Sequence, residues 1–491
     1  MTVKSVWSFF CMKKRLFWVL PCMVLVSHQS VAENFPATLP DETNRDLTSH
    51  LIEESQYTPA VAENAETQSN HSISLEDLEK DFALFHQVFN QAVEQNLELT
   101  EALLPSYEKN PQHDPLLVLY AQSKIALKQN DTGAAVNYLR QIVDEKPDLT
   151  PSRFHLARAL FADGQMDKAE EEFQRIKADK NLPEPVVQIV DQYLNEMAKQ
   201  EKWHFDANLY YISDNNVNNS ANLPPEKVAN CGFMVDCTIT YPQAEKAHGV
   251  GFGLSGRKDT HIKGRYYWRV GANTYGKHYW DNKKYNDITA NVSTGLVYRS
   301  AQRETVLEGY FARRIYGNNG YSKTYGVGVN NSVAMGNRNV LFTALDLSYK
   351  EHDQYQYLNG NDYAVSNTWL HRTSPKQYFT IGFDLGKSGA KDKSEAYQYA
   401  TVRGSWERDW QWQIKSNFSL GLIRRNYQDI NFFGNKRHDN VYYSKLTLYK
   451  KDWHIAGITP RVVANYYKNK SNQKFYSYKK HQIFLDLIKR F

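Results

Sequence analysis

Two cysteines are close enough in the sequence to take part in the same chemical site. Cys231 and Cys237 lie six positions apart, and the other two cysteines of the chain precede residue 32. The spacing matches neither a zinc site nor a redox motif. In an exported chain, two such thiols predict a disulfide that closes a small loop.

Residues 251–256 match the dinucleotide-binding fingerprint by their glycines. That motif works only where a strand passes into a helix whose N-terminus holds a pyrophosphate. Here the glycines alternate within an expected strand that a turn follows, so they predict close packing within a sheet and no bound cofactor. His248, His261 and His278 are expected at the rim of that sheet as structural residues. A catalytic site assembled from scattered Ser, His and Asp residues remains an alternative.

The elements that position these residues are short amphipathic strands between residues 203 and 491. In 379–385 and 483–487 the apolar side chains fall on every second position, and Leu341, Leu345 and Leu347 share a face opposite Asp346. One face of each strand is therefore apolar. In a soluble sandwich that face would meet a second sheet, whereas in an outer-membrane barrel it meets lipid. We favour the barrel.

The other face of these strands carries charges of both signs. The expected lumen residues are Arg265, Arg269, Glu308, Asp384, Arg403, Lys415, Lys445 and Asp486. Mixed signs suit a heterogeneous substrate such as a polypeptide better than one selected ion. Alternatively, these charges pair across the lumen and only hold the barrel open.

The connections between strands alternate in length. A long loop, 214–246, follows the first strand, 203–213; a short turn is expected at 258–260, and short and long connections then alternate to the end. Roughly 20 residues per strand and connection give about fourteen antiparallel strands, an even number as such barrels require. The helical region that precedes the barrel then lies on the periplasmic, short-turn side. The terminal Phe491 resembles the insertion signal of outer-membrane proteins.

Residues 74–202 have a helical period instead. Three pairs of residues are each 34 positions apart, the period of tetratricopeptide (TPR) repeats. They are Tyr120 and Phe154, Ala135 and Ala169, and Leu139 and Phe173. Gly164 and Pro147 stand where the repeat motif has glycine and proline, and the matching positions of the other repeat hold Asn130 and Asn181 instead. This region predicts an α-solenoid whose concave face holds an extended peptide.

The N-terminus predicts export. Residues 13–15 are basic, an apolar run follows to Val26, and 30–32 form a small-x-small cleavage site, so 1–32 read as a signal peptide. Residues 33–73 predict a disordered arm. Removing 1–32 takes away four basic residues and no acidic one, which lowers the net charge from +5 to +1 and argues against nucleic acid as a partner.

A signal, an arm, TPR-like repeats and a barrel of about fourteen strands together resemble the surface lipoprotein assembly modulators, the Slam proteins. The stretch 203–210, followed by 214–218, resembles the opening of their barrel domain. The resemblance implies a non-enzymatic translocon in the outer membrane of a Gram-negative bacterium, with its helical domain in the periplasm. Its cargo would be a surface lipoprotein or a secreted haem-binding protein. Its other implied partners are periplasmic chaperones, the barrel assembly machinery and outer-membrane lipid.

Three alternatives remain from the residues. A polysaccharide exporter also joins helical repeats to a barrel, but it predicts a lumen of one charge sign. A barrel enzyme predicts Ser or Asp within reach of a rim His. A nutrient receptor predicts a plug domain before the barrel, for which residues 33–202 give no pattern.

Overall fold

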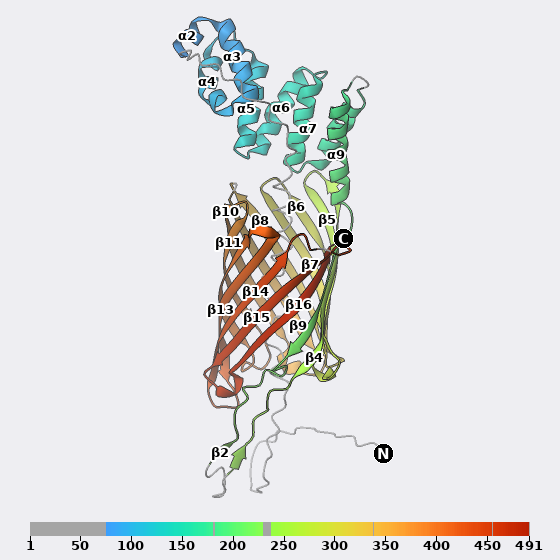
Figure 1. Ribbon diagram of the computed structural model, residues 1–491, viewed down its shortest axis with the longest axis vertical. Coiled ribbons are helices and arrows are strands. Elements are labelled where there is room, and N and C mark those ends of the chain that lie inside the picture. Colours follow the sequence, from blue (N-terminus) through green and yellow to red (C-terminus); the bar gives the residue numbers. More distant parts are fainter. Residues whose placement is uncertain (1–74, 180–181, 229–236, 337, 454, 491) are drawn as a thin grey trace.

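The computed structural model describes residues 75–179, 182–228, 237–336, 338–453 and 455–490. A helical domain stands at one end of a closed barrel, and a long loop with strand β2 extends from the other end (Figure 1). The expected signal peptide and arm, Ser74, Asn181, Cys231 and Phe491 all lie outside the described residues.

Eight helices of the described residues form the N-terminal domain. They are α2 (Leu75–Lys80), α3 (Phe82–Gln95), α4 (Leu97–Lys109), α5 (Pro115–Lys128), α6 (Thr132–Glu145), α7 (Thr150–Ala162), α8 (Met166–Lys177) and α9 (Glu184–Gln200). Asp and Asn side chains accept backbone N–H groups at the first turns of α3 to α6, where a helix leaves its N–H groups unpaired. None of the described helices is long and apolar enough to cross a membrane.

The helical pairs stack with the repeat that the sequence predicts. Ala135, Ala169, Leu139 and Phe173 are fully buried, in the small and large positions of two equivalent helices, α6 and α8. Asn130, in the position that Gly164 takes one repeat later, has a φ of 59° against 77° for Gly164. Asparagine tolerates this left-handed conformation better than most residues, so the turn between helices survives the substitution.

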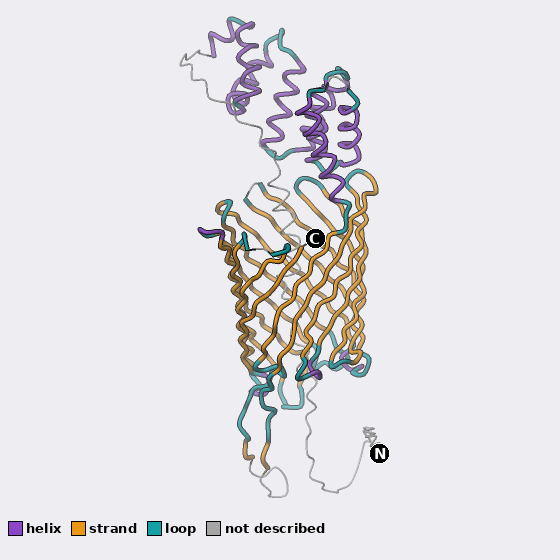
Figure 2. The backbone as a smooth tube through the Cα atoms, turned by 45° about the vertical axis from the view of Figure 1, so that its right-hand side comes forward, coloured by secondary structure: helices purple, strands orange, loops and turns teal. Residues whose placement is uncertain are grey.

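Fourteen antiparallel strands of the described residues close into the barrel. They are β1 (His204–Asp214), β4 (Ala247–Lys263), β5 (Tyr266–Tyr279), β6 (Asp287–Arg299), β7 (Arg303–Tyr316), β8 (Asn319–Met335), β9 (Asn339–His352), β10 (Gly360–Ser374), β11 (Gln377–Ser388), β12 (Tyr397–Asp409), β13 (Ile414–Ile430), β14 (Lys436–Lys450), β15 (Ile458–Ser471) and β16 (Tyr478–Arg490). The strands tilt across the wall (Figure 2), as closure requires. The prediction of helical repeats followed by a barrel of about fourteen strands is confirmed.

The 214–246 loop carries a small hairpin of its own. Strand β2 (Glu226–Val228) pairs with β3 (Cys237–Ile239) at the end of the barrel opposite the helical domain (Figure 1). The predicted disulfide would join two residues of this hairpin region, but Cys231 is outside the described residues, so the disulfide stays a prediction.

Two expected connections differ from the structure. Strand β4 runs through 258–260 to Lys263, and the turn falls at Gly264 and Arg265. A left-handed glycine, with a φ of 60°, makes that turn possible. On the long-loop end, β7 and β8 are joined by Gly317 and Asn318 alone, both with positive φ as in a tight hairpin.

Candidate functional site: the lumen wall and its junction with the helical domain

The strand register separates a lipid-facing row from a lumen-facing row. Leu345 and Leu347 of β9 are 44% and 56% exposed on the outer surface, and Asp346 between them points to the other face. Ladder partners share a face, so the inward row can be followed around the barrel from Asp346. It includes Arg269, Glu308, Asp384, Arg403, Lys415, Lys445 and Asp486.

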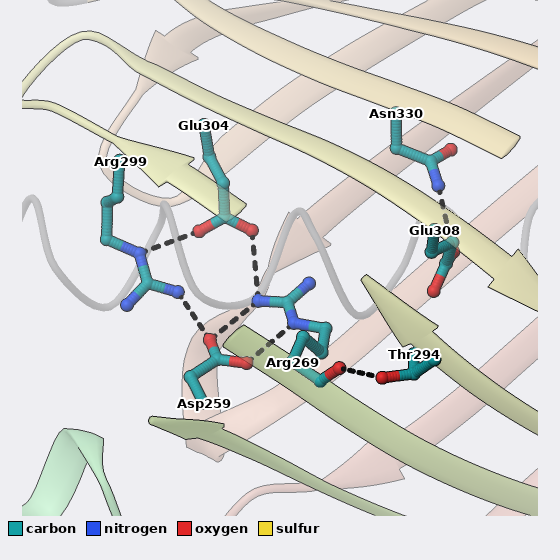
Figure 3. A network of polar contacts seen from close by, with 7 residues as sticks. All are labelled: Asp259, Arg269, Thr294, Arg299, Glu304, Glu308 and Asn330. Atoms are coloured by element: carbon teal, nitrogen blue, oxygen red, sulfur yellow. Dashed lines mark hydrogen bonds and ion pairs between the residues drawn. The ribbon is translucent and has the colours of Figure 1, made fainter. Parts of the chain in front are cut away.

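Four of the inward charges form one network at the end of the barrel nearest the helical domain. Arg269 Nε and Nη2 donate to the two carboxylate oxygens of Asp259, each at 2.7 Å, and Arg299 donates to Asp259 and Glu304, both at 2.8 Å (Figure 3). Arg269 also lies 3.3 Å from Glu304. All four side chains are at most 14% exposed. Two guanidinium groups and two carboxylates leave the cluster neutral, which offsets the cost of burying each charge.

The remaining predicted residues are also held within the wall. Arg403 of β12 donates to both oxygens of Asp384 on β11 at 3.0 Å, and its Nη2 reaches Thr368 of β10 at 2.7 Å. Three further pairs are Lys415 with Glu407, Asp486 with Arg461, and Glu308 with Asn330. Lys445 faces inward opposite Asn465 and Ser419. These bonds join neighbouring or next-but-one strands along the wall, so they neutralise it locally rather than bridging the lumen.

A recess opens on the lumen side of β1 and β4 to β10. Its lining includes polar side chains and charges of both signs, among them Asp206, Arg257, Asn273, Glu308, Asn330 and Asp346. Such a surface offers donors and acceptors without a net field of one sign. The wall can therefore contact a polar chain of varied sequence without binding one charge type.

Arg265 belongs to a different site. It lies in the β4–β5 turn rather than on the lumen wall, and its guanidinium bonds the carboxylate and the backbone carbonyl of Asp163 at the end of α7. Asp163 is 2% exposed. A buried carboxylate paired with a forked guanidinium fixes both position and orientation, so this pair anchors the helical domain to the barrel.

More contacts surround that anchor. Asp167 accepts from the Gly264 backbone N–H at 3.3 Å, and Met166 packs on the buried cluster of Tyr267, Val297 and Val306. Gln302, in the β6–β7 turn, donates to the Asn130 carbonyl. A Cβ on Gly164 would lie 2.7 Å from the Arg299 carbonyl oxygen. The turns of two successive helical repeats therefore sit on the same barrel turn.

The helical domain also holds a polar cluster between α3, α5 and α7. Tyr120 Oη lies 3.0 Å from His155 Nε2, and Lys124 bonds Glu94 at 3.1 Å. Burial, with Arg158 and Lys124 nearby, lowers the pKa of His155 to about 4. His155 is thus neutral at physiological pH, and its Nε2 shares a hydrogen bond with the Tyr120 hydroxyl.

The three histidines expected at the rim have structural contacts. His248 bonds Asp281 at 2.7 Å, His278 lies 3.1 Å from the Asn286 amide, and His261 lies 3.0 Å from the Gly264 carbonyl. Within the described ranges, no three His, Cys, Asp or Glu side chains are grouped as a metal site needs. The glycines of 251–256 lie in β4, where a Cβ on Gly251 would meet the Tyr210 ring at 2.1 Å. They make room for side chains of β1.

Several important residues were not singled out in the sequence. Asp259, Arg299 and Glu304 were missed although Asp259–Arg269 and Arg299–Glu304 are ladder partners around two turns. Opposite charges at symmetric distances from a hairpin turn are a readable signal. The misplaced turn at 258–260 concealed the first pair. Asp163 and Gln302 had no such signal, because they contact residues more than 100 positions away.

A fourteen-stranded barrel with an apolar outside, a polar inside and a helical domain on its mouth defines an outer-membrane β-barrel protein. Residues 203–491 match the family model described as "Surface lipoprotein assembly modifier", and 71–173 match the one described as its N-terminal TPR repeats. The chain belongs to the surface lipoprotein assembly modifier family, and its barrel lies in the outer membrane.

Three relatives illustrate the match. Surface lipoprotein assembly modifier 1 of Haemophilus influenzae is 29% identical over 97% of this chain and 99% of its own length. The surface lipoprotein assembly modifier of Moraxella catarrhalis is 30% identical over 83% of this chain and 80% of its own. The hemophilin secretion modulator of Acinetobacter baumannii is 23% identical over 79% and 82%.

Proposed function

We propose that this protein is a translocon that carries surface lipoproteins, or related soluble haem-binding proteins, from the periplasm to the cell surface. Family membership over both domains carries the proposal. The names of the relatives refer to lipoprotein assembly and to hemophilin secretion, which are two versions of delivering a protein across the same membrane.

The geometry suits this task in two ways. The Asp163–Arg265 anchor holds the helical repeats over the turns of β4 to β7, so a chain received by the repeats is already beside the barrel mouth (Figure 1). In the described part of the lumen wall, charges of both signs lie side by side in local pairs such as Arg269–Asp259, Arg403–Asp384, Lys415–Glu407 and Arg461–Asp486. A polysaccharide exporter would need the opposite arrangement.

In the proposed sequence of events, the repeats receive partly unfolded cargo, the barrel passes it outward, and folding at the surface makes the step irreversible. Periplasmic chaperones would deliver the cargo, and the barrel assembly machinery would insert this chain into outer-membrane lipid. The family is one of assembly modifiers, and we propose that this chain works without a catalytic step of its own.

The test is co-production with a candidate surface lipoprotein of the same bacterium, followed by antibody labelling of intact cells. We expect labelling only when this protein is present, with equal cargo levels in whole-cell lysates. Deleting residues 33–200 while keeping the signal and the barrel should lower the labelled fraction by at least several-fold. Unchanged labelling in cells without this protein would contradict export, and full labelling by the deletion variant would contradict the role of the repeats.

A further inference from the structure

The barrel closes through one ladder that is much shorter than the others. Strands β1 and β16 pair at five positions, Asp206–Tyr210 with Asp486–Arg490, whereas every other pair of neighbouring barrel strands aligns at eleven or more. The five pairs lie at the end nearest the helical domain. In the described part of both strands, the register would continue by pairing Tyr211–Asp214 with residues 482–485, but these four positions make no ladder pair across this seam.

Neither strand is irregular there. Strand β1 stays paired with β4 through Asp214, and β16 stays paired with β15 from Tyr478 onward. Strand β1 therefore stays in register with β4, and β16 with β15. Beyond the five pairs, the edges by which β1 and β16 face each other have no ladder. Unpaired edges bind further strands readily, and at membrane depth an unpaired backbone is costly.

Side chains close this gap on the lumen side. Asp214 Oδ2 accepts from Gln482 Nε2 at 3.0 Å and from Lys480 Nζ at 3.3 Å, and the rings of Tyr210 and Phe484 stack at 4.7 Å. Asp214 is 2% and Lys480 6% exposed. The glycine at 251 leaves the space into which the Tyr210 ring lies. These contacts can separate without breaking a backbone ladder.

The two faces of the gap define what fits it. Tyr211, Ile483 and Leu485 are exposed on the lipid side at 49%, 73% and 52%, while Asp214, Gln482 and Lys480 lie on the inner side. A strand that paired with both edges would need apolar side chains on one face and polar side chains on the other. This is the alternation of a barrel strand, and backbone pairing would supply affinity with little dependence on sequence.

We propose that the outer half of the β1–β16 seam is a lateral gate. Its occupant is an amphipathic β-strand of the exported protein, which pairs with Tyr211–Asp214 or with residues 482–485 after the contacts of Asp214 with Gln482 and Lys480 open. This inference rests on the proposed export function and specifies its route: cargo leaves through the wall rather than along the lumen to its end.

The first experiment locks the seam. Asp214→Cys with Gln482→Cys is joined by a short bifunctional methanethiosulfonate reagent that a reductant removes, in cells producing an epitope-tagged surface lipoprotein that the wild-type protein exports. We expect surface labelling to fall at least tenfold when the seam is locked and to recover on reduction. The matched control is Thr401→Cys with Ile423→Cys, inward-facing partners in the full β12–β13 ladder, where the same cross-link should change labelling less than twofold.

The second experiment looks for the occupant. A photo-reactive amino acid at Tyr211, on the lipid side of the seam, should form an adduct with the lipoprotein during export; the same group at Leu420, on the lipid side of β13, should not. Undiminished export by the locked protein, or adducts at Leu420 equal to those at Tyr211, would overturn the gate. Either result leaves the export function intact, because the wild-type protein still exports; absence of surface labelling with the wild-type protein would instead refute the export function.

Discussion

The helical domain and the barrel place the same kinds of residue on opposite sides. In the helical domain Leu139 and Phe173 are fully buried, because water surrounds the helices and apolar side chains escape it. In the barrel Leu345 and Ile381 are 44% and 58% exposed, and charged Arg403 is 6% exposed. The comparison teaches that the surrounding solvent decides which side chains are buried. Because hydrocarbon surrounds the barrel, its apolar side chains lie on the outside and its polar side chains on the inside.

The largest expected effect on stability comes from a change in the buried apolar core of the helical domain. Leu139→Ala should destabilise the helical domain by roughly 2–5 kcal/mol, because the truncation leaves a cavity between packed helices. The helical signal of the detergent-solubilised protein at 222 nm, followed in urea, measures this. The barrel should keep its heat-modifiable mobility on electrophoresis, and joint loss of both signals would mean that the two regions do not unfold separately.

A charge placed on the outer face of the barrel tests whether that face contacts hydrocarbon. Leu345→Arg should cost about 2–4 kcal/mol, the range for a cation placed on the lipid face near the bilayer midplane. Ala344→Arg, one position along and on the lumen face, is the control and should cost clearly less. The measurement is the folded fraction in lipid vesicles over a denaturant series. Equal costs at the two positions would contradict an apolar exterior.

The junction between the two regions should be sensitive to one methyl group. Gly164→Ala adds a Cβ 2.7 Å from the Arg299 carbonyl at a φ of 77°, so we expect a loss of about 1–3 kcal/mol from the contact with the β6–β7 turn. Protease cleavage between α9 and β1 should rise several-fold. Asn130→Gly at the equivalent turn is the control and should leave cleavage unchanged.

The smallest effect is a pH dependence confined to the helical domain. The pKa of His155 is lowered to about 4, from an ordinary value near 6.5. The unfolded chain therefore binds a proton that the folded domain excludes, and stability falls as pH drops from about 6.5 toward 4. At pH 5 the loss is at most about 2 kcal/mol.

Urea midpoints of the helical signal at pH 7 and pH 5 measure this difference. His155→Gln keeps a hydrogen-bonding side chain beside Tyr120 and lacks the titration, so its midpoints should lie closer together. A wild-type midpoint that does not fall between pH 7 and pH 5 would contradict a neutral, shielded His155.

Much of the barrel wall could be predicted from the spacing of apolar residues along each strand. Alternation along 379–385 and 483–487 predicts which face meets lipid, since side chains of a strand alternate whatever their partners. The 34-residue spacing from Ala135 to Ala169 predicts stacked repeats, because only small residues fit where paired helices approach. The positions of turns, and with them the strand register, were predicted less accurately: the turn expected at 258–260 falls at 264–265. That shift hid the Asp259–Arg269 pair and placed Arg265 on the wall instead of at the junction.

The sequence by itself determined the two periods, helical and then alternating, and with them a helical-repeat domain followed by a barrel with a lipid-facing exterior. Period is a local property that each segment carries alone. Only the tertiary structure decided that Asp163 meets Arg265, and that β1 and β16 join at five positions with Asp214 and Lys480 bridging beyond them. Those partners are 102 and 266 positions apart, so no local pattern links them; the first pair needs the helical domain docked on the β4–β5 turn, and the second forms only when the first and last strands meet.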